Sequence, residues 1–530
     1  MDSSKIKLVL ITSLAMFFAI YLGIAAATAQ LEAVAWVVGA GCVVGVLALG
    51  KNVWLLIPFG LILQGTVNAL PGSPPVWALG TLVTLGMFTL RFAMHKRDFA
   101  LKFDMLDFAI LLNVIAIAQA YVRNPTGLLM FGGDTAGGKP YLNFAVAVVA
   151  FFCLSAIKTD MRMFRIAVLM MVVATIGDGL IGVLSDYIPL LAMVVLPIYS
   201  NTNVEVALTG EASNTDTGIA RAGGAFGEFG RALGVICFSM ARPLHCLLPT
   251  HPLLFASTGI AFVMVLLSGF RSMLMYLLVV FVVSAFIRRK YFDIIAISVA
   301  GVLGLCLLIG SGQIRNLPFG AQRALSFLPI ELDERAREDA DKSSDWRFEM
   351  WELALTTDRY IQNKWLGDGF AVSAREMRAQ LDAAQGYATG VVIDNKEAFL
   401  ARGSYHGFHV ECIRFTGAFG LACAIFAMIV FFRKAVKLVR YYRYHPMFPF
   451  IAFVCIPFLI YPFWSLLVFG AYRVAFPQFL ASAGLLKMLD AIRVQEIAAT
   501  AAAVPEPDRV PHASRLLPSH ARSGGKAHQR

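Results

Sequence analysis

The residues best suited to chemistry are a few arginines and histidines beside long apolar runs. Arg221 begins the stretch Arg-Ala-Gly-Gly-Ala-Phe-Gly, and Arg271 lies in a short turn between two apolar runs. His406, His409 and Arg414 come just before another apolar run. Arginine stays charged and binds phosphate through paired hydrogen bonds, while histidine can take up a proton near neutral pH. The set therefore suits an anionic, phosphate-bearing substrate and a step that moves a proton.

Each of these signals also has a simpler interpretation. An arginine at the end of a membrane span often anchors the helix by extending to the headgroups, and the glycines after Arg221 could form an ordinary loop. His406 and His409 are three residues apart, so a metal pair is conceivable. Only Glu411 and Cys412 lie nearby in the sequence, and they complete no convincing ligand set. We therefore predict neither a metal nor a cofactor.

The composition of the chain sets the frame that must position these residues. The 530 residues are 58% hydrophobic and 15% charged, with a mean hydropathy of +0.70. Soluble proteins carry about 25% charged residues, so this chain is too apolar for one aqueous core. Disordered and disulfide-scaffold classes are excluded on the same grounds. The sequence predicts an all-α polytopic membrane protein.

Apolar runs of about 20 residues mark the predicted transmembrane helices. Fourteen are predicted. Twelve or thirteen remain possible, because the adjacent runs 31–50 and 52–70 and the last two runs are the weakest predictions. A short run at 188–198 is expected to be interfacial or re-entrant. The predicted spans are 7–28, 31–50, 52–70, 76–94, 105–122, 141–157, 166–185, 231–248, 253–269, 272–287, 292–311, 416–432, 447–468 and 473–490.

The positive charges predict the orientation of the spans. With a cytoplasmic N-terminus, the inside short loops hold 18 Lys and Arg and the outside short segments hold 6. This is the bias of cytoplasmic loops, and it places both termini inside. Arg221, Arg271 and His406 then share the exterior face. The net charge of +11 thus sets topology, and no nucleic-acid partner is predicted.

The chain divides into four predicted parts. Residues 1–185 are closely connected transmembrane helices, and residues 433–490 are the last ones. Residues 186–432 form the functional core, with exterior loops at 186–230 and 312–415. Residues 491–530 are Ala-, Pro- and Arg-rich, which is typical of a disordered basic cytoplasmic tail.

The exterior loop 312–415 is too long for a plain linker. Apolar residues between Asp345 and Gln362 follow a helical period, and Ser343 or Ser344 could cap that helix. The helix could lie on the membrane with its aromatic face down, or form a small lid with a core of its own. The sequence leaves both alternatives open.

The order of the motifs resembles the bacterial O-antigen ligase and polysaccharide polymerase superfamily. The resemblance covers about residues 215–425. It rests on the stretch from Arg221, the turn Leu267-Ser268-Gly269-Phe270-Arg271, Trp346-Arg347 with Trp351, Leu366-Gly367-Asp368-Gly369-Phe370, and His406 eleven residues before Gly417. Members of this superfamily are membrane-embedded glycosyltransferases that need no metal. They move a glycan from undecaprenyl diphosphate to an acceptor hydroxyl at the periplasmic face of the inner membrane.

The resemblance implies roles for individual residues. Arg221 and Arg271 match arginines thought to hold the diphosphate, and His406 matches the histidine proposed to activate the acceptor. Arg347 matches an arginine of the long loop. The predicted catalytic residues are therefore His406, Arg271 and Arg221. The predicted substrate-binding residues are Arg347, Arg323, His409, Arg414 and Trp351.

The sequence departs from the family pattern in several places. Gly407 stands where Asn often follows the histidine, and Phe415 stands where an acidic residue is common. Phe270 replaces a common Ser, and Lys364-Trp365 replaces a proline. These differences suggest a divergent branch and leave His409 as the substitute for His406.

The expected function is polymerisation of undecaprenyl-diphosphate-linked repeats into a surface polysaccharide or exopolysaccharide. A ligase that attaches glycan to a lipid or protein is the alternative, and a transporter or flippase is a third. The expected partners are the lipid-linked donor, the glycan acceptor and membrane lipids, and the resemblance also allows a chain-length regulator.

Overall fold

The structure is a computed structural model, and it describes most of the chain between residues 39 and 503. The described residues are 16, 21, 39–41, 44–46, 48–63, 65–94, 102–127, 137–195, 198–200, 224–326, 328, 330–371, 399–400 and 403–503. Within them nearly all regular structure is helical, and β1 (Thr66–Val67) and β2 (Tyr199–Ser200) form one short antiparallel pair.

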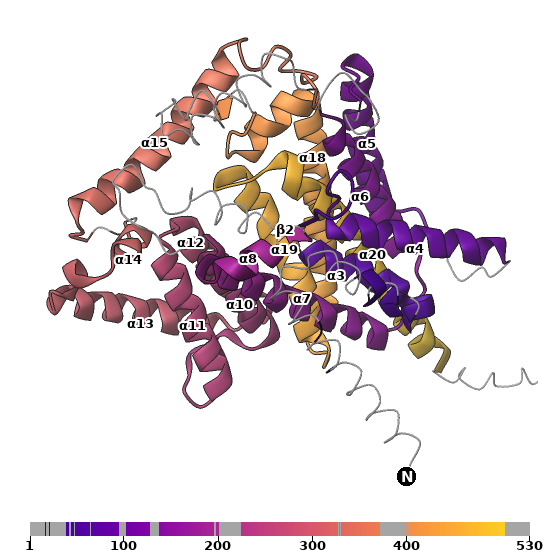
Figure 1. Cartoon of the computed structure of the whole chain (residues 1–530). Helices are drawn as coiled ribbons and strands as arrows, with labels where there is room; N and C mark the ends of the chain where they lie inside the picture. The colour runs from indigo at the N-terminus through magenta and orange to yellow at the C-terminus, as the bar shows by residue number, and fades with distance from the viewer. Residues whose placement is uncertain are drawn as a thin grey trace, which may run out of the picture.

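Long helices make up the body of the molecule (Figure 1). They are α4 (Val76–Ala93), α5 (Met105–Arg123), α6 (Gly138–Ala156), α7 (Met161–Tyr187), α10 (Gly224–Met240), α11 (Pro252–Ser268), α12 (Arg271–Ile287), α13 (Tyr291–Gly310), α15 (Glu334–Thr356), α18 (Phe408–Tyr442), α19 (Phe448–Leu467) and α20 (Tyr472–Ala503). The shorter elements are η1 (Gly50–Leu55), α3 (Leu56–Ile62), α8 (Pro189–Val195), η3 (Pro243–Leu247), η4 (Gln313–Asn316) and α14 (Phe319–Ala324).

The predicted class of all-α polytopic membrane protein is confirmed. In the described part of the chain, seven helices are long and apolar enough to cross a membrane, or eight if a bent pair before residue 63 counts as one span. The helices α11 and α12 are also apolar but have only 17 residues each. The predicted span 7–28 lies almost wholly outside the described residues, and of the span 31–50 only 39–41, 44–46 and 48–50 are described.

The predicted span at 52–70 is wrong, because the chain there is not one helix. It forms η1 and then α3, which ends at Ile62, and β1 follows. The polar Thr66 side chain bonds Asn68 at 3.0 Å and Ser200 at 3.2 Å. The mean hydropathy of residues 52–70 cannot reveal that Thr66 pairs with Ser200, which lies far along the chain.

The helix predicted at 231–248 is displaced toward the N-terminus. The helix α10 begins at Gly224 and ends at Met240, before the Arg242-Pro243 pair. Its glycines permit close helix packing, as in other membrane helices. A Cβ on Gly227 would lie 2.6 Å from Ser268 Oγ, and one on Gly230 would lie 2.8 Å from the Ala261 carbonyl oxygen. The second half of the glycine stretch after Arg221 is therefore helical.

The segment 312–371, predicted to be exterior, contains η4, α14 and α15. The helix α15 starts at Glu334, eleven residues before the predicted Asp345, and it ends at Thr356 instead of Gln362. Its cap is Asp333, whose side chain accepts a hydrogen bond from Arg335 N at 2.9 Å. The prediction that Ser343 or Ser344 caps the helix is wrong, because a better capping carboxylate stands further upstream.

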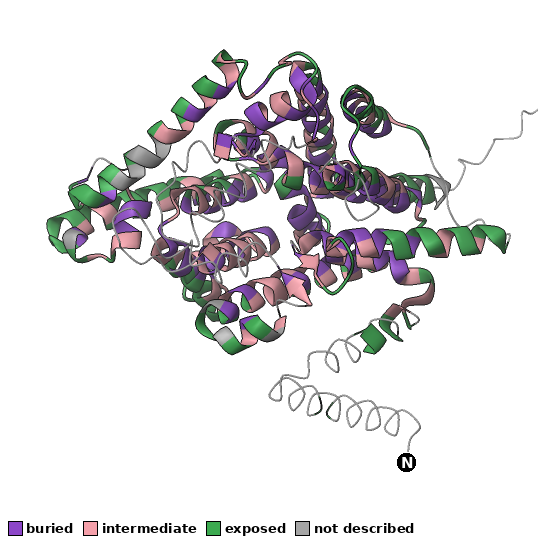
Figure 2. Cartoon of the chain, turned by 45° about the horizontal axis from the view of Figure 1, so that its top comes forward, coloured by how far each residue is buried: buried purple, intermediate pink, exposed green. Residues whose placement is uncertain are grey.

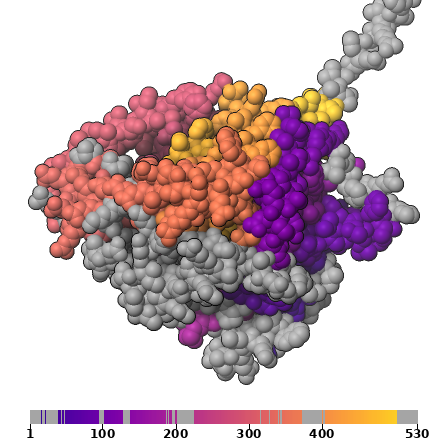
Figure 3. All heavy atoms as spheres, turned by 90° about the horizontal axis from the view of Figure 1, so that it is seen from above, coloured from indigo at the N-terminus to yellow at the C-terminus, as the bar shows by residue number. Residues whose placement is uncertain are grey.

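The apolar face of α15 packs against the protein. Met350 and Ala354 are fully buried with Leu400, Tyr405 and Val410 in a small separate core. In Figure 1, α15 rises from α14 to the top of α18. Seen from above, coral and orange residues form a broad strip that reaches the purple N-terminal helices (Figure 3). This packing favours a lid with its own core over a helix with its aromatic face on the membrane.

The main core gathers around α18, α19 and α20. Buried residues lie in the centre of the molecule and exposed ones on the outlying helices (Figure 2). The helix α18 extends well beyond the predicted 416–432 and is interrupted at Gly417, which has φ 75° and ψ −179°.

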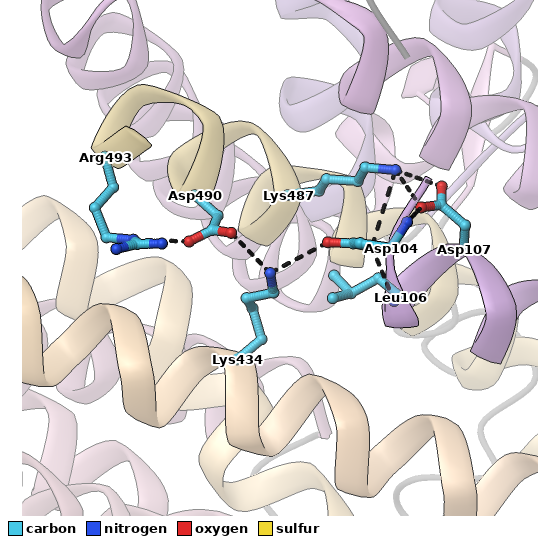
Figure 4. Close-up of polar contacts among 7 residues, drawn as sticks. All are labelled: Asp104, Leu106, Asp107, Lys434, Lys487, Asp490 and Arg493. Atoms are coloured by element: carbon cyan, nitrogen blue, oxygen red, sulfur yellow. Dashed lines mark hydrogen bonds and ion pairs between the residues drawn. The ribbon is translucent and has the colours of Figure 1, made fainter. Parts of the chain in front are cut away.

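An ion-pair network ties α5, α18 and α20 together (Figure 4). It alternates three carboxylates and three cations. Its members are Asp107, Lys487, Asp104, Lys434, Asp490 and Arg493. Lys487 binds both oxygens of Asp107, and these side chains are 8% and 1% exposed.

Candidate active site

His406 occupies a strained loop immediately before α18. Its φ is +51°, in the left-handed region that residues other than glycine rarely adopt. Such a conformation costs about 1–3 kcal/mol and persists only where the surroundings enforce it. Here the Trp351 indole Nε1 donates a hydrogen bond of 2.7 Å to the Tyr405 carbonyl oxygen. The α15 helix therefore holds the backbone next to His406.

Gly407 makes this arrangement possible. A Cβ on Gly407 would lie 2.8 Å from Cε2 and Nε1 of Trp351, which is too close for a larger residue. The position where the family often has Asn therefore has a packing reason to be glycine in this chain.

The His406 ring lies in an aromatic cage. Its centroid is 5.1 Å from the ring of Phe399, 5.6 Å from Phe469 and 5.9 Å from Trp346. Burial, with a further contribution from the positive charge of Arg347, lowers the pKa of His406 to about 4. The ring is therefore neutral near pH 7 and able to accept a proton.

Three arginines from three helices lie near one another, and one of them, Arg347, acts on this histidine. Arg271 is the first residue of α12, Arg323 lies in α14 and Arg347 lies in α15. Burial and the charges of Arg271 and Arg323 lower the pKa of Arg347. Arg323 is 7% exposed, and its Nη1 donates a 2.9 Å hydrogen bond to the Gly269 carbonyl oxygen in the turn before Arg271.

Arg414 serves a different contact. It forms an ion pair with Asp368 in the Leu366–Phe370 loop, and both side chains are mostly buried. Asp368 also accepts hydrogen bonds from Gln362 N at 2.9 Å and Asn363 N at 2.8 Å. The structure thus places Arg414 in the docking of this loop.

The same loop docks where α18 is interrupted. Gly369 N donates to the Phe415 carbonyl oxygen at 3.0 Å, and Ala418 N donates to the Lys364 carbonyl oxygen at 2.8 Å. A Cβ on Gly417 would lie 2.2 Å from the Trp365 carbonyl oxygen. The Gly-Asp-Gly motif therefore fixes the loop that follows α15 to α18.

His409 also contacts α15, through Trp351. Its ring is 4.8 Å from the Trp351 ring, edge to face. Its Nδ1 is buried and has no hydrogen-bond partner among the described residues. Burial alone lowers the pKa of His409, whereas burial and the charge of Arg347 lower that of His406, so the arginine cluster adjoins His406.

Residues 256–400 match the family model described as O-antigen ligase. This segment of the membrane protein is therefore O-antigen ligase-like. Members of this family are membrane enzymes that transfer glycosyl groups. No curated protein matches the chain at a significant level.

The O-antigen ligase match covers only part of the predicted site. It includes Arg271, Arg323, Arg347 and Trp351 and ends six residues before His406. The structure brings this histidine to the matched part through α15. Arg221 precedes the matched stretch and lies outside the described residues, so its predicted role stays a prediction.

Sequence reasoning missed several residues around this candidate site. The Phe399 and Phe469 rings flank His406 from different parts of the chain, and nothing in their local sequence marks them. Glu411, considered in the sequence only as a metal ligand, is 4% exposed and accepts a 2.7 Å hydrogen bond from Tyr472 N. Among the described residues, no group of three His, Cys, Asp or Glu side chains is placed to hold a metal ion.

Proposed function

We propose that this protein polymerises oligosaccharide repeats carried on undecaprenyl diphosphate at the periplasmic face of the bacterial inner membrane. The observation that carries the proposal is the cluster of Arg271, Arg323 and Arg347, of which Arg347 acts on the neutral His406. A diphosphate matches such a set, because guanidinium groups bind phosphate oxygens in pairs. The proposed orientation keeps both termini in the cytoplasm.

The proposed reaction forms one bond and breaks one. The hydroxyl oxygen of the acceptor sugar bonds to the anomeric carbon of the donor glycan. The bond from that carbon to the diphosphate oxygen breaks, and undecaprenyl diphosphate leaves with the electron pair. The hydroxyl proton goes to the His406 ring. Arginines that stabilise the charge growing on the leaving group supply the electrostatic contribution that is often largest in catalysis.

Substrate binding would also tune His406. A diphosphate beside the ring adds negative charge, which favours the protonated imidazolium and raises the pKa of His406 from about 4. The base would therefore become stronger only once the donor is bound. A positioned base of this kind contributes roughly 10²–10⁴-fold to the rate.

The second candidate is a ligase that transfers finished glycan to a lipid or protein acceptor. The description of the matching family as O-antigen ligase favours it. Both candidates use the same donor chemistry at the same residues. They differ only in the acceptor, so the lipid-linked intermediates separate them.

The test is analysis of lipid-linked glycans in a deletion strain. Accumulation of single lipid-linked repeats supports the polymerase, and accumulation of long lipid-linked chains supports the ligase. Complementation with the wild-type chain should restore the product, whereas Arg271→Ala and His406→Ala should not, at equal protein level. Transport of the lipid-linked sugar by the purified protein without bond formation would contradict both candidates.

A further inference from the structure

A cavity of about 830 Å³ lies at the opposite end of the helix bundle from His406. Four cationic side chains line it, namely Lys51, Arg91, Lys158 and Arg162, together with one carboxylate, Asp160. The Asp160 Oδ1 already accepts a 2.8 Å hydrogen bond from Met163 N, as the cap of α7. The lining is therefore strongly cationic.

The position of the cavity follows from α6. Near the start of this helix, the Tyr141 hydroxyl accepts a 3.1 Å hydrogen bond from Phe370 N in the exterior segment. The cavity is lined by Ile157, just past the other end of α6. At 1.5 Å per residue, the two ends lie about 24 Å apart. All four cations lie in loops or at helix ends that the charge bias assigns to the cytoplasm.

The inner wall of the cavity is apolar. Trp54 is 3% exposed, and Phe88, Met163 and Ile166 line the cavity with it. Lys51, Lys158 and Arg162 are exposed. The cavity thus combines a cationic rim in contact with water and an apolar wall that continues toward the helices.

We propose that this cavity binds an anionic membrane phospholipid, with the phosphate at the Lys51–Lys158 rim and the first part of an acyl chain against Trp54 and Phe88. Cationic pockets between transmembrane helices on the cytoplasmic side suit lipid phosphates. A free phosphate would use the rim but leave the apolar wall unused. The site is independent of glycosyl transfer and lies apart from the three exterior arginines.

The test uses the purified full chain in zwitterionic detergent and a fluorescent phosphatidylglycerol as the probe. Lys51→Gln combined with Lys158→Gln should weaken binding about 30-fold, since each cation near an anionic lipid surface contributes about a factor of five. The matched control combines Lys437→Gln with Arg440→Gln. It removes the same charge from the same predicted face at exposed positions outside the cavity, and it should leave affinity unchanged.

Competition distinguishes the sources of the phosphate. Unlabelled phosphatidylglycerol should displace the probe, and phosphatidylcholine and inorganic phosphate at equal concentration should not. Equal weakening in both double variants would overturn the proposal, because binding would then follow net charge alone. Full displacement by inorganic phosphate would also overturn it, because the apolar wall would contribute nothing. Equal unfolding temperatures of the variants without lipid show that folding is intact.

Discussion

The ion-pair network and the arginine cluster differ in how their charges are arranged. On one side, Asp104, Asp107 and Asp490 alternate with Lys434, Lys487 and Arg493, so the charges balance at short range (Figure 4). On the other, burial and the charges of the neighbouring Arg271 and Arg323 lower the pKa of Arg347. The balanced network is complete without a ligand and serves to hold helices. In the arginine cluster the charges of Arg271 and Arg323 repel Arg347, and an anion bound beside Arg347 would offset that repulsion.

The largest expected effect is on the balanced network. Lys487→Met leaves the Asp107 carboxylate buried without its cation, and loss of one partner of a buried pair costs about 3–5 kcal/mol of folding free energy. The measurement is the unfolding temperature in detergent. Lys364→Met, which breaks the exposed pair with Asp358, is the control and should cost at most about 1 kcal/mol.

A second variant tests whether the cost at Lys487 arises from the unpaired charge. Lys487→Met combined with Asp107→Leu removes both charges and should recover much of the lost stability. If the double variant is no more stable than Lys487→Met alone, packing and not charge accounts for the effect.

The arginine cluster should respond in the opposite way. Arg347→Ala should reduce glycan transfer about 10²–10³-fold, as loss of one preorganised group that stabilises developing charge does. Its unfolding temperature should stay the same or rise, because a like-charge repulsion is removed. Arg347→Lys keeps the charge but not the paired hydrogen bonds, so its activity should lie between.

The control for Arg347 is Arg359→Ala in the same exterior segment. The Arg359 side chain is exposed and lies over the Tyr360 ring at 5.2 Å. Transfer should be unchanged in this variant. A large loss of stability with Arg347→Ala would show that the cluster is structural, like the balanced network.

The pH dependence of stability sharpens the same comparison. Unfolded histidine has a pKa of about 6.5, and that of His406 is about 4 in the folded protein. Between these values the unfolded chain binds a proton that the folded chain does not. Stability should therefore fall as the pH is lowered from about 6.5 to about 4.

His406→Gln should flatten this part of the curve of unfolding temperature against pH. The exposed His445 provides the control, and His445→Gln should keep the wild-type slope. The interpretation fails if both variants give the same curve as the wild type, because His406 would then not be held neutral.

The sequence predicts these regions to different extents. The sequence predicts part of the arginine–histidine cluster, because charge bias and span parity assign Arg271 and His406 to one face. It does not predict the network, since Asp107 and Lys487 are 380 residues apart and each lies in an apolar run. The sequence predicts the helix α15 but places its start too late, because Ser343 and Ser344 resemble a cap as well as Asp333 does. The aromatic cage depends on Phe399 and Phe469 meeting in space, which no local pattern encodes.

The smallest expected effect concerns how the lid holds the histidine. Trp351→Phe keeps an aromatic ring against His409 but removes the indole N–H that donates to the Tyr405 carbonyl oxygen. One such bond is worth about 1 kcal/mol, so transfer should slow about fivefold with little change in the apparent affinity for the donor. Trp346→Phe is the control, because it keeps a ring beside His406 and leaves the Tyr405 bond intact.

If Trp351→Phe weakens donor affinity and leaves turnover unchanged, Trp351 contacts substrate directly, as the sequence predicted. If turnover falls alone, the lid acts by keeping His406 in its strained conformation.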